Sequence, residues 1–148
     1  MVIDVLRNKS EQKAFYELCC YTTTHSDPNF IHQHVVDAFA AQTADKKTKP
    51  ITITFALVGL YLHLEKNFTG KKVQQAHIKL AKHKKLWPNF KLPVKKGNIT
   101  VYDVINVEEG SNRDEMIVKW CESVWTAYVE DHAMVVDLVK RELWPRKQ

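Results

Sequence analysis

The stretch that decides the fold is NRDEMIVKWCESVWTAYVEDHAMVVDLVKREL, residues 112–143. At the helical step of about 100° per residue, its apolar side chains fall on one side. They are Ile117, Trp120, Cys121, Val124, Trp125, Tyr128, Val135, Leu138 and Val139. Charged residues occupy the other side, and Pro145 follows the end. The pattern predicts one long amphipathic helix over residues 112–143.

Two ionisable residues interrupt the apolar side of this predicted helix. His132 falls within the apolar stripe, and Asp131 lies on its flank. A buried polar group without a partner costs about 1–3 kcal/mol, so an inward histidine needs a partner from elsewhere in the fold. Two interpretations follow: a core histidine hydrogen-bonded to a neighbour, or a metal ligand or general base.

Composition places the chain among globular proteins. Apolar residues make up 45% of its 148 residues, and there are only four glycines. We expect one domain over residues 1–148, without a membrane span because no run of 18 apolar residues exists. The N-terminus lacks the apolar core of an export signal, and the three cysteines (Cys19, Cys20 and Cys121) show no C-x-x-C spacing. Both features predict a cytoplasmic protein with reduced thiols.

Helical patterns recur along the rest of the chain, and no alternating strand pattern occurs. Helices are expected at residues 10–21, 27–44, 50–67 and 70–86, with a short one at 101–107. Asp27-Pro28 and Pro50 mark two helix starts, and Thr69 is the expected cap of another. The sequence therefore predicts an all-α, single bundle-like domain of four main helices plus short helices, with a long C-terminal helix.

Ionisable residues on the predicted core sides define a candidate site. His32 and His34 flank the stripe of the second helix, and at most one of them is expected to reach the same point as His132. In the third helix, Glu65 rather than His63 continues the most apolar strip and is expected to face inward. Imidazole and carboxylate ligands suit Zn, Ni, Mn or Fe.

The metal hypothesis assigns a role to each of these residues. His32, Glu65 and His132 are the predicted metal ligands. Glu65 and Asp131 are the predicted catalytic pair, with Glu65 as ligand or general base and Asp131 as an orienting group. No standard spacing such as H-x-x-x-H or H-E-x-x-H supports this set. A buried hydrogen-bond network that fixes helix register is the alternative, and Gln42, at the centre of the second helix's core side, is its polar neighbour.

Motif absences exclude several functional classes. The chain lacks G-x-x-x-x-G-K-[ST], G-x-G-x-x-G and G-x-S-x-G, so we expect no nucleotide cofactor and no serine-triad hydrolysis. The sequence leaves open whether the bundle core binds a small molecule and whether the chain forms a homo-oligomer. The class of reaction, if any, is not indicated.

A lysine-rich stretch supplies the alternative function. Residues 66–102 hold ten lysines and no acidic residue, whereas the rest of the chain holds 12 basic and 17 acidic residues. A non-catalytic interaction or scaffold protein would contact a polyanionic or acidic partner through the predicted helix 70–86. The stretch lacks arginine and interleaved exposed aromatic residues, which disfavours nucleic acid as that partner.

Three phrases carry a resemblance to a known family: HQHVVDAFAAQ at residues 32–42, LHLE at 62–65, and WCESVW at 120–125 followed by His132. They resemble a family of small bacterial proteins that is catalogued as a domain of unknown function, over roughly residues 15–143. The resemblance implies a bacterial origin and no particular activity. Some relatives carry spaced N-terminal cysteines, from which the adjacent Cys19 and Cys20 depart. At fold level the predicted bundle is also similar to His-ligated bundles of the DinB type.

Overall fold

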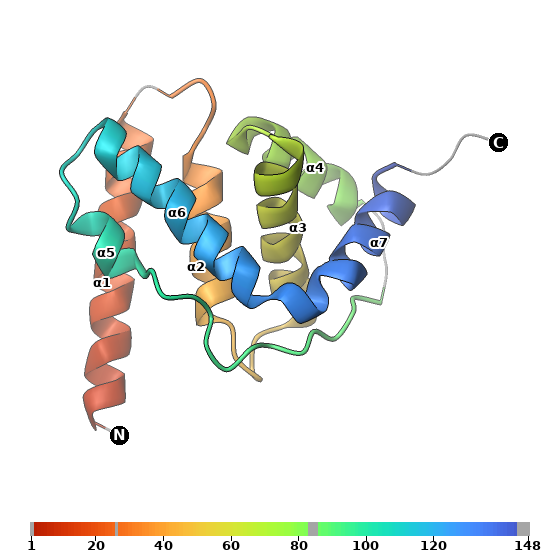
Figure 1. The fold of residues 1–148 in the computed structure, drawn as a ribbon, viewed down its shortest axis with the longest axis horizontal. Coiled ribbons are helices and arrows are strands. Elements are labelled where there is room, and N and C mark those ends of the chain that lie inside the picture. The colour runs from red at the N-terminus through yellow and green to blue at the C-terminus, as the bar shows by residue number, and fades with distance from the viewer. Residues whose placement is uncertain (1, 26, 83–85, 145–148) are drawn as a thin grey trace.

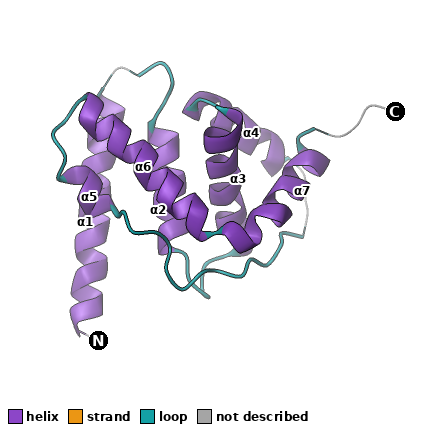
Figure 2. Ribbon diagram, viewed as in Figure 1, coloured by secondary structure: helices purple, strands orange, loops and turns teal. Residues whose placement is uncertain are grey.

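The computed structural model describes residues 2–25, 27–82 and 86–144. Its helices are α1 (Val2–Thr24), α2 (His32–Thr43), α3 (Pro50–Lys66), α4 (Gly70–Ala81), α5 (Val101–Ile105), α6 (Ser111–Ala127) and α7 (His132–Glu142), with a 3₁₀ turn at Val129–Asp131. No strand occurs in these residues (Figure 2). The prediction of an all-α fold is confirmed. None of the described helices is both long enough and apolar enough to cross a membrane.

The helices are arranged around the antiparallel pair α2 and α3. On one side of this pair, α1 packs against α2 and carries the short helix α5. Helix α6 crosses both members of the pair, and α4 and α7 pack against α3 at the opposite end from α1 (Figure 1). This arrangement gives α2, α3 and α6 a shared core, in which Trp120 and Tyr128 are the largest fully buried side chains.

Helix boundaries match the sequence where local signals are strong. Helix α3 starts at Pro50 as predicted and ends before Asn67, whose left-handed backbone (φ 56°) closes it. Thr69 caps α4 by accepting a hydrogen bond from the Lys72 N–H. The predicted helix 70–86 is too long, because α4 ends at Ala81; residues 83–85 lie outside the described part of the chain.

The start of the second helix was predicted too early. The Asp27 carboxylate accepts hydrogen bonds from the Asn29 and Ile31 N–H groups, so it caps a separate turn. Phe30 in that turn has a positive φ of 58°, which a helix does not allow. As a result α2 begins only at His32, and the turn forms part of the wall of a pocket described below.

The prediction of one long C-terminal helix is wrong. The chain forms α6, bends sharply at the 3₁₀ turn and continues as α7 (Figure 1). Tyr128 and Asp131 donate their N–H groups to carbonyls three residues earlier, instead of the four that an α-helix requires. No proline or glycine lies at the bend, so the sequence gives no local signal for it.

Contacts from remote segments account for the bend. The Tyr128 hydroxyl donates to the Ala41 carbonyl at 2.6 Å, and the Asp131 carboxylate accepts from the Lys91 N–H at 2.9 Å. At the bend itself, His132 Nε2 donates to the Trp125 carbonyl at 2.7 Å. In a continuous α-helix the Trp125 carbonyl would accept the N–H of the residue four positions later, but here it accepts a hydrogen bond from the His132 imidazole. The tertiary hydrogen bonds therefore outweigh the local preference for a helix.

A polar network in the core fixes the loop that precedes α5. The Gln42 amide donates to the Lys96 carbonyl (3.1 Å) and the Ile99 carbonyl (2.7 Å). Its oxygen accepts the Trp120 indole N–H at 2.8 Å. Gln42, which the sequence places at the centre of the core side of α2, therefore joins α2, α6 and this loop through three hydrogen bonds.

Candidate functional site

Two histidines stack against each other between α2 and α3. The rings of His34 and His63 have centroids 3.5 Å apart and planes inclined by 14°. His34 is only 5% exposed, and His63 is half-buried. The Nδ1 atom of His34 and the Nε2 atom of His63 are both buried and have no hydrogen-bond partner within the described structure. Unsatisfied buried nitrogens are uncommon and point to a ligand or to bound water.

The two imidazoles line a pocket of about 510 Å³, which we call the His pocket. Its walls come from the end of α1, the turn before α2, the segment between α3 and α4, and the start of α6. The remaining lining residues are Tyr21, Thr22, His25, Asp27, Asn29, Ile31, Asn67, Phe68, Thr69, Asp114 and Val118. Three parts of the chain that are distant in sequence, with lining residues numbered 21–34, 63–69 and 114–118, therefore meet at this pocket.

Burial sets the charge of the imidazole pair. It lowers the pKa of His34 to about 3, and the neighbouring His63 lowers it further in the same direction. The pKa of His63 is also lowered by burial. Both rings are therefore neutral at neutral pH, and each presents one N–H donor and one lone pair.

The backbone of Phe68 also acts on His63. It raises the pKa of His63 and so opposes the effect of burial, which is the larger of the two. The Nε2 atom of His63 has no partner, and in a neutral ring each nitrogen is either an N–H donor or a lone-pair acceptor. This nitrogen can therefore form a hydrogen bond with a ligand.

A buried carboxyl group lies behind the histidine pair. Asp37 is 3% exposed, accepts a hydrogen bond from the Gln33 amide at 3.1 Å, and has an unpartnered Oδ2 atom. Burial raises its pKa well above the usual range, with the Gln33 hydrogen bond opposing the shift. Asp37 lies on the opposite side of α2 from its apolar stripe, and it is buried because α3 packs on that side of α2.

Gly59 allows this close approach of α2 and α3. A Cβ at position 59 would lie 1.9 Å from Asp37 Oδ2 and 2.5 Å from its Cγ. We expect Gly59→Ala to lower the free energy of unfolding by about 1–3 kcal/mol, because the overpacked helices must separate. Urea unfolding followed by circular dichroism measures this change. Asp37→Ala in the same chain should restore most of the loss; equal destabilisation with and without Asp37 would contradict the explanation.

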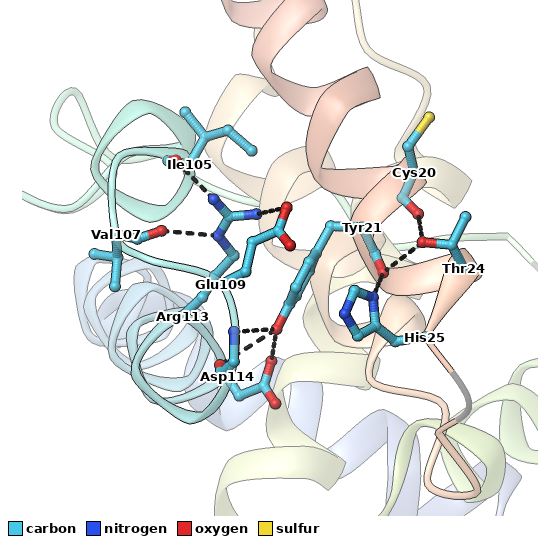
Figure 3. A network of polar contacts seen from close by, with 10 residues as sticks. Cys20, Tyr21, Thr24, His25, Ile105, Val107, Glu109, Arg113 and Asp114 are labelled. Carbon is cyan, nitrogen blue, oxygen red and sulfur yellow. Dashed lines mark hydrogen bonds and ion pairs between the residues drawn. The ribbon is translucent and has the colours of Figure 1, made fainter.

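Tyr21 lines the His pocket and also lies at the centre of a network of polar contacts (Figure 3). Its hydroxyl donates to Asp114 Oδ1 at 2.8 Å and accepts the Gly110 N–H at 3.1 Å. The Tyr21 ring lies between the His25 imidazole, 4.3 Å from its centroid, and the Arg113 guanidinium, 4.7 Å from its centroid. These contacts hold the start of α6 against the end of α1 and direct the Asp114 carboxylate to the pocket.

Arg113 lies on the far side of this ring, against the loop before α6. Its guanidinium donates to the carbonyls of Ile105 (2.9 Å) and Val107 (3.0 Å) and pairs with Glu109 at 3.6 Å (Figure 3). Arg113 is therefore a structural clamp for the loop and does not line the His pocket.

Two residues of the predicted metal set meet at one tryptophan. The Trp125 indole donates to Glu65 Oε2 at 2.6 Å, and the His132 ring stacks on Trp125 with centroids 3.7 Å apart. Glu65 is exposed, which corrects the expectation that it rather than His63 faces inward. It lies at the last turn of α3, where the carboxylate reaches both water and the indole.

The other predicted residues lie among different partners. His32 Nδ1 bonds the Thr22 hydroxyl at 2.9 Å, beside the His pocket but not in its lining. Asp131 is 1% exposed; one of its oxygens accepts the Lys91 N–H, and the other has no partner. No group of three or more His, Cys, Asp or Glu residues suited to a metal ion occurs within residues 2–25, 27–82 and 86–144.

Sequence reasoning missed His63 as a pocket residue, although a signal was available. Thr52, Ala56, Gly59 and His63 form a strip on α3 that is less apolar than the opposite side. Small residues on that strip suit close helix packing, and α2 contacts α3 there, as the approach of Asp37 to Gly59 shows. Giving more weight to the small-residue strip than to the apolar strip would have identified the pair.

Comparisons with known proteins give one match. Comparison with curated proteins and with solved structures finds no match, so the similarity to DinB-type bundles stays a prediction. A family model matches residues 9–129, a region that includes α2, α3, α6 and every residue that lines the His pocket. The chain belongs to this family, which is described as a family of unknown function (DUF5946).

Proposed function

We propose that this protein binds a small polar molecule in the His pocket, with His34 and His63 as contact residues. The observation that carries the proposal is the pair of stacked, neutral imidazoles, each with an unpartnered buried nitrogen, in the lining of a pocket. The volume of about 510 Å³ suits a small molecule, since ligand pockets commonly measure about 300–1,000 Å³.

Recognition is favoured over general base catalysis by His34. A general base works best when its pKa lies near the working pH, and the pKa of His34 is about 3. A neutral imidazole of this kind serves better as a hydrogen-bonding group that selects a ligand. A ligand that forms hydrogen bonds with the two unpartnered nitrogens would remove the cost of leaving them unsatisfied, and this free energy would add to the binding affinity.

A divalent transition metal (Zn, Ni, Mn or Fe) is the second proposal. Neutral imidazole is the form that binds metals, and burial keeps both His34 and His63 neutral. The predicted set His32, Glu65 and His132 is the competing location for such a metal. Against the His pair stands its geometry: rings stacked 3.5 Å apart direct their lone pairs side by side rather than toward one point.

We expect polar fragments to shift the imidazole NMR signals of His34 and His63, and Val118→Trp to abolish these shifts. Val118 lines the pocket, so a tryptophan there takes up part of the space that a fragment needs. A fragment library is screened by ¹H–¹³C NMR, together with Zn²⁺ and Ni²⁺ as separate samples. Metal shifts at His132 but not at His34 would locate the metal at the predicted set instead.

Thr126→Trp is the matched control for the blocking variant. Thr126 is exposed on the same helix, α6, and does not line the His pocket. It should leave fragment binding unchanged, and melting curves check that both variants fold. The proposal fails if no fragment shifts the two imidazoles, or if Val118→Trp and Thr126→Trp bind fragments equally.

A further inference from the structure

We propose that the ligand of the His pocket is a small organic cation with N–H donors, such as a primary amine. This inference rests on the proposed function and names the chemical class of its ligand. Three independent observations support it: the charges that line the pocket, the free acceptors within it, and the positions of two nearby basic groups.

The formal charges in the lining are negative. Asp27 and Asp114 are carboxylates, the imidazoles of His34 and His63 are neutral, and no lysine or arginine of the described residues lines the pocket. This is unexpected in a chain with a net charge of +5. Negative lining in a concave site attracts cations and repels anions.

Helix ends add smaller charges and do not reverse this sign. The starts of α2, α4 and α6 lie at the pocket, and a helix start carries roughly +0.5 of a charge. The ends of α1 and α3 also lie there, each contributing roughly −0.5. Because the two carboxylates each bring a full negative charge, the net field favours a cation.

Two basic side chains that contact lining residues, Arg113 and Lys72, do not themselves line the pocket. Arg113 is held by the carbonyls of Ile105 and Val107, on the other side of the Tyr21 ring (Figure 3). Lys72 lies with its Nζ atom 5.7 Å from the centre of the Phe68 ring and is exposed. Neither side chain neutralises the lining, so its charge is available to a ligand.

The pocket also offers acceptors that lack donors. His63 Nε2 is buried without a partner, and in one of the two neutral forms of the ring this nitrogen accepts a hydrogen bond. Asp114 uses Oδ1 for the Tyr21 hydroxyl, and a carboxylate has capacity for further hydrogen bonds on its second oxygen. An ammonium group has three donors and no acceptor, which matches this arrangement better than a carboxylate or phosphate ligand.

The experiment compares three probes of one size and different charge: benzylamine, benzyl alcohol and benzoate. Each is titrated into the wild-type protein, and the imidazole signals of His34 and His63 report binding. We expect benzylamine to bind about tenfold more tightly than benzyl alcohol, and benzoate to bind most weakly. Added salt should weaken benzylamine binding and leave benzyl alcohol unchanged.

Asp114→Asn tests the source of this preference. Asparagine keeps an acceptor for the Tyr21 hydroxyl and removes the charge, so benzylamine affinity should fall about three- to tenfold. Binding of benzyl alcohol should not change. Asp137→Asn is the matched control, because Asp137 is an exposed carboxylate on α7 that pairs with Arg141. It should leave all three affinities as in the wild type.

Several results would overturn the inference and leave the pocket in place. Equal or tighter binding of benzoate or benzyl alcohol removes the preference for a cation, although the proposed function stands. Shifts caused by library fragments, with none caused by benzylamine, have the same meaning. Displacement of benzylamine by one equivalent of Zn²⁺ would identify a metal cation rather than an amine. Failure of the whole fragment library would instead contradict the proposed function itself.

Discussion

Gln42→Glu is expected to lower the free energy of unfolding by about 3 kcal/mol or more at neutral pH. The amide donates to two carbonyls, those of Lys96 and Ile99, and accepts the Trp120 indole N–H. A glutamate carboxylate keeps the bond to Trp120 but has no N–H to donate. Two carbonyls would lose their partner and face a negative charge, at about 1–3 kcal/mol for each unsatisfied group.

Urea unfolding followed by tryptophan fluorescence measures this loss. At a pH below the pKa of the new carboxyl, the protonated group regains one donor, and part of the lost stability should return. Gln74→Glu is the control, because Gln74 is exposed on α4 and should change stability by less than about 0.5 kcal/mol. A loss of similar size in both variants would show that the network is not what stabilises this region.

Gln42 also shows how far sequence reasoning reaches in this fold. Helical spacing places Gln42 at the centre of a core side, and in the structure its amide oxygen accepts the indole N–H of Trp120 on α6. Helical spacing cannot identify the Lys96 and Ile99 carbonyls as partners of Gln42, because these two residues lie in an irregular segment that has no helical periodicity. Periodicity therefore predicts which side of a helix is buried but not which loop crosses it.

The C-terminal region shows the opposite case, in which periodicity misleads. In the sequence the apolar stripe of residues 112–143 continues at helical spacing on both sides of Val129–Asp131, so the spacing does not reveal the 3₁₀ turn there. The bend is held by the Tyr128–Ala41 and Asp131–Lys91 hydrogen bonds. The partners Lys91 and Ala41 lie at least 40 residues away in sequence, so no local sequence pattern predicts these hydrogen bonds. The predicted set His32, Glu65 and His132 relied on a straight helix, and the structure gives these residues separate partners.

The candidate pocket could be predicted only in part. His34 was recognised as one of two histidines at the edge of α2, but the choice between His32 and His34 depends on how α1 and α3 pack. That packing depends on Gly59, which lets Asp37 approach α3 closely. A buried aspartate beside a glycine breaks the rule that charged residues face water, so helical spacing alone does not place Asp37 in the interior. Functional sites commonly break such local rules.

Stability is expected to fall by about 2–4 kcal/mol through His34 as the pH is lowered from 7 toward 4. Burial lowers the folded-state pKa of His34 from 6.5 to about 3, whereas the unfolded chain keeps the ordinary value. Between these two values the unfolded state binds the proton and the folded state does not. The contribution of neutral His34 is therefore complete above about pH 6.5 and is lost progressively as the pH falls toward 3.

His34→Gln tests this account, because glutamine cannot take up the proton. Urea unfolding at several pH values from 7 to 4.5 should give a shallower dependence in the variant than in the wild type. His25→Gln, which alters an exposed histidine, should keep the wild-type dependence. Asp37 acts in the opposite direction, because its raised pKa makes acid favour the folded state, and it is present in every variant compared. An unchanged slope in His34→Gln would mean that the stacked imidazole takes up a proton in the folded state. Burial would then not keep the histidine pair neutral below about pH 6.5, and the neutral pair would be limited to the pH range in which an ordinary histidine is neutral.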